Sequence, residues 1–373
     1  MRIAYVSLHW PRTKNSGVGK KIQSQLAAWI ERGHDARLFM HTSAYQPQTE
    51  LIDAERFYYS NSGKAGTEIA RMRAMARMIT AIRYFRPDLI YLRYGIYVFP
   101  AHLLMNIAPV VEEINTDDLA QHETLGGFYS LYNRITRGII LRGVRGLVTV
   151  SRELSTSPAF ATFHKPTRVI SNGIDLGSIR PFPAPGNKTP RLFFMATPDY
   201  AWHGIDKLVM LGRRYPDMII DVVGYQEIID SGELPSNIRL HGYLPSTVYE
   251  KILGQADVAI STLALHRKNM KEASPLKTRE CLAFGLPVVM AYTDTDLDDL
   301  DCTFLLKIPN RESNIETHGE HIHDFAFRMR GQRADREKLI NRIDLHAKED
   351  QRLDFFRETL VDHKTLAIDN STH

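Results

Sequence analysis

The strongest constraint on the fold of this chain is an alternation of short apolar runs with helical stretches, and it occurs twice. In the first half, apolar and β-branched runs recur between helical segments, at residues 3–8, 36–40, 88–92, 110–114 and 146–150. A second series follows at residues 192–195, 219–223, 238–240, 258–260 and 287–290. Strands that alternate with helices in this way form a mostly parallel sheet with helices on both faces. The sequence therefore predicts an α/β protein with two Rossmann-like halves.

Prolines mark the change from the first series to the second. Five prolines and an Asn-Gly pair at 172–173 lie within residues 166–190. The prolines are Pro166, Pro181, Pro183, Pro185 and Pro190. Dense Pro and Gly favour turns and connecting segments. We therefore expect a domain at residues 1–170, a linker at 171–189 and a second domain at 190–349. Beyond the last strand signal the chain is helical and charged, and a final helix is expected at about 350–373.

Composition excludes several classes of protein. With 43% apolar and 24% charged residues, the 373-residue chain has the composition of a soluble globular protein. A net charge of +4 is too small to indicate nucleic-acid binding, and it fits a phosphate-bearing ligand or an anionic membrane surface equally well. The two cysteines, Cys281 and Cys302, are too few for a disulfide framework, so the reducing cytoplasm is the expected compartment. No apolar stretch is long enough to span a membrane.

The segment 271–289 contains the most specific motif in the chain. Ser274 is suited to cap a helix and Pro275 to occupy its first position. The first amides of that helix, near Leu276 and Lys277, would then point out of its amino terminus, where the helix dipole favours an anion. Lys277 adds a full positive charge. The segment therefore predicts a site for a phosphate group.

Two glutamates flank this helix start, Glu272 before it and Glu280 within it, and their carboxylates suit sugar hydroxyls. Spacing alone is weak evidence, but the Glu-x7-Glu pattern followed by Gly-x-Pro-Val-Val at 285–289 resembles that of retaining GT-B glycosyltransferases, specifically glycosyltransferase family 4. Three other segments resemble the family's glycine-containing loop, its last N-domain strand and its Asn-Gly-x-Asp linker, namely 17–19, 147–151 and 171–175. The resemblance implies two Rossmann-like domains facing a cleft, with a C-terminal helix that crosses back to the first.

The resemblance also implies a donor site. Glu280 would bind the nucleotide ribose and Glu272 the transferred sugar, while the backbone from Ser274 through Pro275 and Leu276 to Lys277 would hold sugar and diphosphate. Tyr243 lies where the family contacts the base. Gly17 and Gly19 would approach a phosphate or the acceptor, although a simple strand-to-helix turn is the alternative. A P-loop is excluded because Lys14 and Lys21 stand where that motif needs Gly and Ser or Thr.

One departure from the family concerns the loop after the first strand of the second half. Where the family usually places an Arg and, six residues on, a Lys against the diphosphate, this chain has Thr197 and His203. His203 would still donate to a phosphate, which would raise the pKa of its imidazole. A loop histidine that caps Asp206 or faces solvent is the alternative. The expected catalytic residues are Glu272, Lys277 and His203.

The acceptor is expected at the first half. Glu113 and Asn115 follow the apolar run 110–114 and resemble a family branch with Glu-x-Asn at this point, and Arg93 would line the same cleft. Ordinary polarity of a surface loop is the alternative.

A basic helix at 131–148 suggests a membrane contact. Arg134, Arg137, Arg142 and Arg145 fall within an arc of about 140° at 100° per residue, opposite Ile135 and Ile139. Such helices bind anionic lipid, but more often they pack the apolar face and solvate the basic one.

No metal or cofactor is expected. The acidic residues 294, 296, 298 and 299 lie beyond the position where the family holds the diphosphate, and His318, His321 and His323 lack the spacing of a zinc site and are expected in a loop. The resulting prediction is a metal-independent, retaining hexosyltransferase. It would use a nucleoside-diphosphate sugar and a glycan or lipid-linked acceptor, in bacterial polysaccharide or glycolipid synthesis, at the cytoplasmic face of the membrane.

Three other interpretations stay open. One is a GT-B enzyme of another reaction type, such as a phosphorylase or a sugar-nucleotide epimerase. A second is a non-catalytic sugar-nucleotide-binding partner of a polysaccharide-synthesis machine, suggested by the missing Arg and Lys. A third, an NAD(P) dehydrogenase, is disfavoured because no G-x-G-x-x-G follows a strand.

Overall fold

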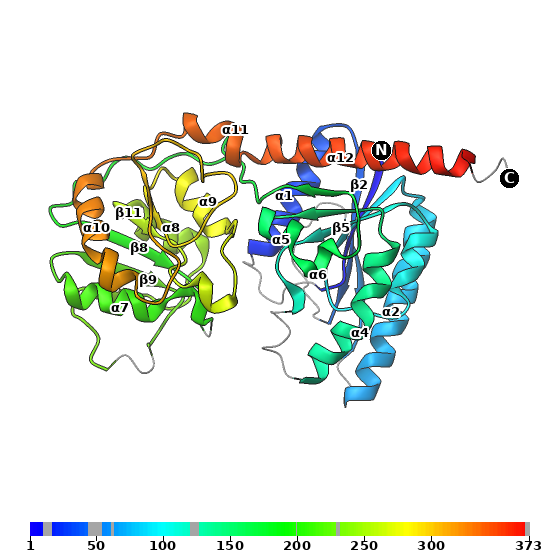
Figure 1. Ribbon diagram of the computed structural model, residues 1–373, viewed down its shortest axis with the longest axis horizontal. Helices are drawn as coiled ribbons and strands as arrows, with labels where there is room; N and C mark the ends of the chain where they lie inside the picture. Colours follow the sequence, from blue (N-terminus) through cyan, green and yellow to red (C-terminus); the bar gives the residue numbers. More distant parts are fainter. Residues whose placement is uncertain are drawn as a thin grey trace. The chain divides into compact units, whose positions relative to one another are not determined.

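The computed structural model describes residues 1–9, 17–43, 54–60, 63–119, 127–198, 200–228 and 232–369, without the side chains of residues 64 and 362–369. The chain forms two compact units (Figure 1). Unit 1 comprises Met1–Ile170 and Leu345–His373, and unit 2 comprises Ser171–Asp344. Residues 171–189, expected as a linker, thus fall in unit 2, and residues 345–349, expected in the second domain, fall in unit 1.

Unit 1 is built on a seven-stranded parallel sheet with the strand order β3-β2-β1-β4-β5-β6-β7. The strands are β1 (Arg2–Ser7), β2 (Asp35–Thr42), β3 (Ala54–Tyr58), β4 (Leu89–Arg93), β5 (Val110–Ile114), β6 (Gly146–Thr149) and β7 (Thr167–Val169). The helices are α1 (Gly17–Glu31), α2 (Gly63–Phe85), η1 (Ala101–Asn106), α4 (Gly127–Gly143), α5 (Arg152–Thr156), α6 (Pro158–Ala161) and α12 (Leu345–Asp369). The sequence pattern missed β3 and β7, which lie at the two edges.

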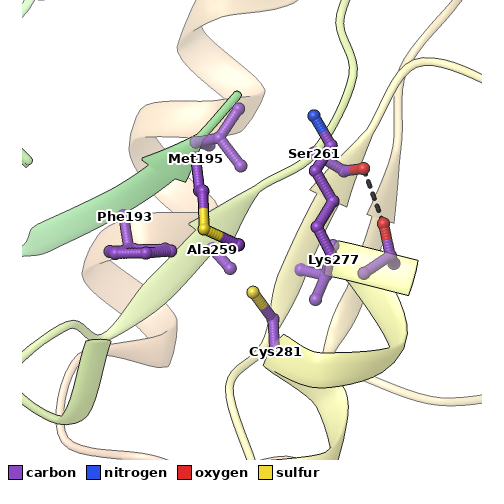
Figure 2. A pocket seen from close by; sticks show the side chains of 9 residues that line it. Phe193, Met195, Ala259, Ser261, Lys277 and Cys281 are labelled. Carbon is purple, nitrogen blue, oxygen red and sulfur yellow. Dashed lines mark hydrogen bonds between the residues drawn. The ribbon is translucent and has the colours of Figure 1, made fainter. Parts of the chain in front are cut away.

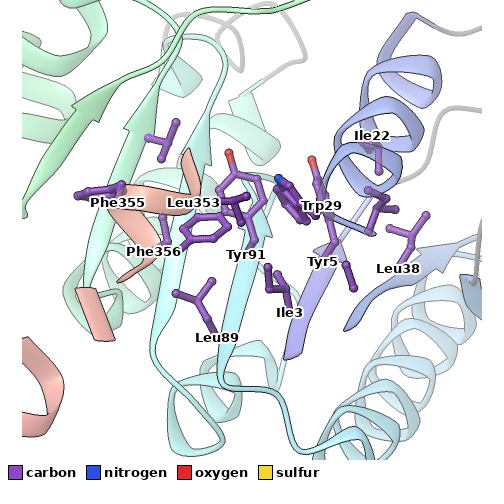
Figure 3. Close-up of a cluster of buried hydrophobic side chains, with 14 of the residues drawn as sticks. Ile3, Tyr5, Ile22, Trp29, Leu38, Leu89, Tyr91, Leu353, Phe355 and Phe356 are labelled. Atoms are coloured by element: carbon purple, nitrogen blue, oxygen red, sulfur yellow. The ribbon is translucent and has the colours of Figure 1, made fainter. Parts of the chain in front are cut away.

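An aromatic cluster joins the sheet of unit 1 to α1 and α12 (Figure 3). The Trp29 ring of α1 lies 5.6 Å from Tyr91 on β4 and 5.6 Å from Phe356 on α12. Tyr5 of β1 stacks on Trp29 at 5.8 Å. Such ring pairs stabilise a core beyond the apolar area they bury. The helix at the end of the sequence is therefore part of the core of the first unit.

Unit 2 is built on a six-stranded parallel sheet with the order β10-β9-β8-β11-β12-β13. The strands are β8 (Arg191–Met195), β9 (Ile219–Val223), β10 (Ile238–Leu240), β11 (Val258–Ile260), β12 (Val288–Met290) and β13 (Leu305–Lys307). The helices are η2 (Ala201–His203), α7 (Ile205–Arg214), α8 (Ser246–Gly254), η3 (Leu265–Lys268), α9 (Leu276–Ala283), α10 (Asn314–Met329), η4 (Glu337–Leu339) and α11 (Ile340–Ile343). The histidines 318, 321 and 323 lie in α10, so the expectation of a loop there is wrong.

Each sheet has one point where the strand order reverses, between β1 and β4 in unit 1 and between β8 and β11 in unit 2. Open α/β sheets bind ligands outside the carboxyl ends of the strands at such points. The two expected site regions, residues 93–115 and residues 197–203 with 272–280, follow strands next to these reversals. Among the described residues, no helix is long and apolar enough to cross a membrane.

Candidate functional site

In unit 2, hydrogen bonds draw together the loops that follow neighbouring strands. Ala196 N, just after β8, donates to Val223 O at 3.1 Å, and Gly224 N, just after β9, donates to Gly242 O at 2.7 Å. Gly224 has φ +105°, and a Cβ there would lie 1.9 Å from the Ala196 carbonyl oxygen. Only glycine fits such a backbone conformation and approach. The loops that contain Thr197 and Tyr243 are thereby held side by side, with the Tyr243 side chain 63% exposed.

The helix start at α9 differs from the expectation by one position. Pro275 is the N-cap, and no side chain caps the helix. The Ser274 hydroxyl instead accepts hydrogen bonds from Asn172 N at 2.9 Å and Arg279 Nη2 at 3.0 Å. The expected cap by Ser274 is therefore wrong. Because the first amides of a helix have no carbonyl within the helix to bond, Leu276 N and Lys277 N stay suited to an anion.

Lys277 and His203 lie together. Lys277 extends from the first turn of α9 beside Ser261, with Cys281 one turn further along the helix (Figure 2). These residues line a cavity of about 10 Å³, which has room for no more than one water molecule. Lys277 Nζ lies 3.3 Å from His203 Nδ1 and 5.2 Å from the Phe194 ring centroid. The sequence prediction that these two side chains act at one place thus has a geometric basis.

Burial sets the protonation of this pair. Burial lowers the pKa of Lys277 to about 8, while burial, followed by the positive charges of Lys277 and Lys268, lowers the pKa of His203 to about 3. His203 is therefore neutral, and its Nδ1 accepts a hydrogen bond from the Lys277 ammonium. That bond leaves the ring hydrogen on Nε2, the atom that can donate to a phosphate oxygen.

The two glutamates of the motif are positioned differently. Glu280 Oε1 accepts a hydrogen bond from the Tyr249 hydroxyl of α8 at 2.7 Å, which orients its carboxylate. Glu272 lies beside Thr293, which follows β12, and the flanking bonds join Thr293 N to Lys271 O and Ala273 N to Thr293 O. Glu272 is partly exposed just before the open helix start.

In unit 1, Glu113 is a fully buried carboxylate at the carboxyl end of β5. Its oxygens lie 2.8 Å from Lys21 Nζ and 2.9 Å from Arg93 Nη1, and it accepts from Asn115 Nδ2 at 3.0 Å. Burial raises the pKa of Glu113, but Lys21, Arg93 and Arg352 outweigh burial and hold that pKa well below its usual range. The expected acceptor residues Glu113, Asn115 and Arg93 thus form one ion cluster, in which Glu113 itself is inaccessible and Arg93 is partly exposed.

Gly17 and Gly19 lie at the start of α1, with Gly17 exposed and Gly19 buried. Lys21 of the same helix start donates to Asn115 Oδ1 at 2.8 Å, so the glycines and the ion cluster occupy the same edge of the unit 1 sheet. Residues 10–16, which precede Gly17, lie outside the described residues.

Sequence reasoning missed Arg279, which is fully buried in α9. It binds Asp294 through two hydrogen bonds of 2.6 and 2.8 Å and Asp296 through one of 2.9 Å. These carboxylates form an Asp-x-Asp sequence, but both face a guanidinium. α9 reads Leu-Lys-Thr-Arg-Glu-Cys-Leu-Ala, so an arginine among other polar residues gave no signal that Arg279 is buried. Among the described residues, no group of three or more His, Cys, Asp or Glu is arranged to hold a metal ion.

The basic helix α4 buries one of its arginines and exposes the others. Arg137 is buried, and its guanidinium binds Asp118 through two hydrogen bonds of 2.7 and 2.8 Å. The outer face is both apolar and basic: Arg134 and Arg142 are exposed. The exposed fractions of its apolar residues are 76% for Phe128, 58% for Leu131, 70% for Ile135 and 41% for Ile139. The expectation that Arg137 lies on the solvated face is therefore wrong, because Arg137 is held inside by its ion pair with the buried Asp118.

Comparisons with known proteins fit this architecture. Residues 15–178 match the family model described as Glycosyltransferase Family 4. No curated protein sequence matches the chain. A sucrose-phosphate synthase from Thermosynechococcus elongatus has a similar structure (TM-score 0.67, 13% identity, 97% of this chain and 99% of that chain covered). So do the lipopolysaccharide outer core galactosyltransferase WaaB in its apo form (0.66, 10%, 96% and 100%) and Anabaena HepE in complex with UDP and glucose (0.66, 16%, 96% and 100%).

Proposed function

We propose that this chain is a retaining, metal-independent hexosyltransferase of glycosyltransferase family 4 that uses a nucleoside-diphosphate sugar. Residues 15–178 match the model of that family, and the two units have the GT-B fold. The acceptor is a glycan or a lipid-linked sugar in polysaccharide or glycolipid synthesis. The observation that carries the proposal is the uncapped start of α9, with Lys277 and the neutral His203 beside it.

The reaction requires a group that stabilises the departing diphosphate. Donors fixed in place before the reaction stabilise such developing charge without reorganising. The amides of Leu276 and Lys277, the Lys277 ammonium and the His203 Nε2 hydrogen would supply four such donors. The diphosphate in turn raises the pKa of Lys277 and keeps it charged. Thr197 and His203 then need not replace the family's Arg and Lys charge for charge, because Lys277 supplies the cation.

The carboxylates bind the sugar parts of the donor. Glu280, oriented by Tyr249, accepts from the ribose hydroxyls, and Glu272 accepts from the transferred sugar. Tyr243 contacts the base. On unit 1, Arg93 and Asn115 bind the acceptor, with Glu113 holding both in place. Metal independence is supported by the pairing of Asp294 and Asp296 with Arg279, which leaves this Asp-x-Asp sequence committed to an ion pair.

A thermal-shift panel of UDP-, GDP- and other nucleotide sugars tests the donor site. A ligand at 100 times its Kd adds about 2.7 kcal/mol of stability, which gives a readily measured shift. Lys277→Met should lose the shift, whereas Lys188→Met, at an exposed position in the same unit, should retain it. No shift with any nucleotide sugar contradicts the proposal. Binding without transfer or hydrolysis would favour the non-catalytic sugar-nucleotide-binding protein, and activity abolished by EDTA would contradict metal independence.

We further propose that the enzyme contacts an anionic membrane through α4. Its apolar stripe, Phe128, Leu131, Ile135 and Ile139, runs along one exposed face, and residues 127–145 contain four arginines and no acidic residue. Apolar side chains beside arginines suit the interface of an anionic bilayer. The buried ion pair between Arg137 and Asp118 keeps this stripe outward.

Vesicle sedimentation tests the membrane contact. The protein should bind vesicles of phosphatidylcholine with phosphatidylglycerol and not vesicles of phosphatidylcholine alone. Ile135→Asp should abolish binding, because it places a charge in the middle of the stripe. Val248→Asp, which changes an exposed aliphatic residue on α8 of unit 2, serves as the matched control. Equal binding to the two kinds of vesicle, unchanged by Ile135→Asp, would contradict the membrane contact.

A further inference from the structure

The buried cluster around Arg279 is a feature that the proposed reaction does not use. Beyond its bonds to Asp294 and Asp296, Arg279 donates through Nε to Asn172 O at 3.1 Å and through Nη2 to Ser274 Oγ at 3.0 Å. Five acceptors thus surround one guanidinium with no exposed surface. A buried ion pair contributes little to stability compared with apolar residues of the same volume, so stability alone does not account for this cluster.

The cluster keeps the start of α9 open. A serine hydroxyl before a helix ordinarily caps it by accepting from an amide of the first turn. Here the Ser274 oxygen already accepts two hydrogen bonds, one from Arg279 and one from Asn172 N, and so both of its lone pairs are used. The amides of Leu276 and Lys277 are thereby reserved for an anion. Asn172 Nδ2 also donates to the Ser274 carbonyl, which fixes the backbone of the same residue.

The same contacts reach both places where the chain passes between the units. The first passage lies between residues 170 and 171, and Ser171 donates to Asp296 while Asn172 bonds Ser274. The second passage lies between residues 344 and 345. Just before it, Ile343 O accepts from Ile174 N at 2.9 Å, and Arg342 donates to Asp296 O at 2.9 Å.

We propose that Arg279 is a positioning residue that couples the anion-binding start of α9 to the two chain passages. An anion bound by the amides of Leu276 and Lys277 orders the backbone at Ser274. The hydrogen bonds of Arg279 and Asn172 extend this ordering to residues 171–176 and 340–344. The inference rests on the proposed function, since it needs an anion at α9. Anion binding at the donor site and ordering of the two chain passages, residues 171–176 and 340–344, then favour each other.

Hydrogen–deuterium exchange of the full chain, with and without inorganic pyrophosphate, tests this coupling. In the wild type, pyrophosphate should slow exchange at residues 274–278 and also, by a factor of about 5 or more, at 171–176 and 340–344. Arg279→Lys keeps the charge but cannot bridge five acceptors, so it should retain the effect at 274–278 and lose it at the passages. Arg333→Lys, a control at a partly buried arginine that bonds backbone carbonyls elsewhere in unit 2, should behave as wild type.

A second variant keeps the test decisive if Arg279→Lys fails to fold. Ser274→Ala removes the acceptor shared by Arg279 and Asn172 and should also uncouple the passages from pyrophosphate. Protection at 274–278 with no change at the passages in the wild type would overturn the coupling and leave the proposed function intact. No protection at 274–278 would contradict the anion site itself, and with it the proposed function.

Discussion

Two adjacent glutamates on β5 have opposite electrostatic environments. Side chains alternate between the faces of a sheet, so Glu112 and Glu113 point to opposite sides. Glu113 meets Lys21 and Arg93 and stays ionised although it is buried. Burial, and then the charge of Asp118, raise the pKa of Glu112 to about 8, and within the described part of the chain its Oε2 has no hydrogen-bond partner. One strand thus carries a charged carboxylate on one face of the sheet and a neutral carboxyl group on the other.

Glu112 should make the protein less stable as the pH rises. Its folded pKa of about 8 exceeds its ordinary value of 4.5, so the folded state retains a proton that the unfolded state has lost. Stability therefore falls between these two pH values, by about 5 kcal/mol in total. Glu112→Gln should remove this dependence. Urea unfolding of both proteins at about pH 5 and about pH 9 checks it, because other titrating groups are common to both. An equal difference between the proteins at both pH values would contradict the assignment.

The lowered pKa of Lys277 predicts that anion binding also depends on pH. Its pKa of about 8 in the empty site means that it loses its charge at alkaline pH. If the anion binds the charged form, affinity for pyrophosphate should fall about tenfold for each pH unit above that value. Calorimetric titration from about pH 6.5 to 9.5 measures the fall. Lys277→Arg should flatten the profile, since a guanidinium stays charged. A flat profile in the wild type would exclude Lys277 from the anion site.

At the scale of elements, sequence patterns predicted the features that lie in one contiguous stretch of the chain. The ten strands expected from apolar runs all occur, and nine of them lie in the interior of a parallel sheet, where both faces of a strand are covered. The tenth, β10, is an edge strand. The edge strands β3, β7 and β13 were missed, since a short, partly exposed strand lacks such a run. The segment from Glu272 to Glu280 was found because its motif is contiguous in sequence.

Long-range partners were not predictable in the same way. The orientation of α4 depends on the ion pair between Arg137 and Asp118, 19 positions apart, which no helical periodicity reveals. The Arg279 cluster likewise joins residues 172, 274, 294 and 296. A motif shows which residue types are present, whereas only the fold shows which of them pair and which remain open to a ligand.

The contact of α12 with β6 gives a prediction for a single element. Phe355 packs so closely over Gly146 that a Cβ at residue 146 would lie 2.8 Å from the Phe355 Cζ atom. Gly146→Ala should therefore push α12 away from the sheet and cost about 1–3 kcal/mol of unfolding free energy. Gly186→Ala, where a Cβ meets nothing within 4 Å, should be neutral. Chemical denaturation of the two variants measures the difference, and equal stabilities would show that α12 does not press on β6.

At the scale of the whole molecule, unit 1 is assembled from both ends of the chain. Leu353, Phe355 and Phe356 of α12 lie in the same buried cluster as Ile3, Trp29 and Tyr91. Arg352 donates to the Tyr91 hydroxyl at 2.6 Å, and Trp29 Nε1 donates to Glu349 at 2.8 Å. Unit 2, by contrast, is one continuous segment.

This difference predicts that the two units respond differently to truncation. A fragment of residues 171–344 should fold alone, unfold cooperatively and bind pyrophosphate, because its core and the start of α9 are complete. A fragment of residues 1–170 lacks α12 and should be unfolded or molten, since losing even one buried aromatic such as Phe356 costs about 3–5 kcal/mol.

Adding a peptide of residues 345–369 in trans should restore the first fragment, as judged by the near-ultraviolet circular dichroism of Trp29 in the buried cluster. The matched control is a peptide with Phe356→Asp, which keeps the helix length but brings a charge into the apolar core. A folded 1–170 fragment with no peptide present would show that α12 covers a core that is already stable, and the helix would then be dispensable for the fold of unit 1.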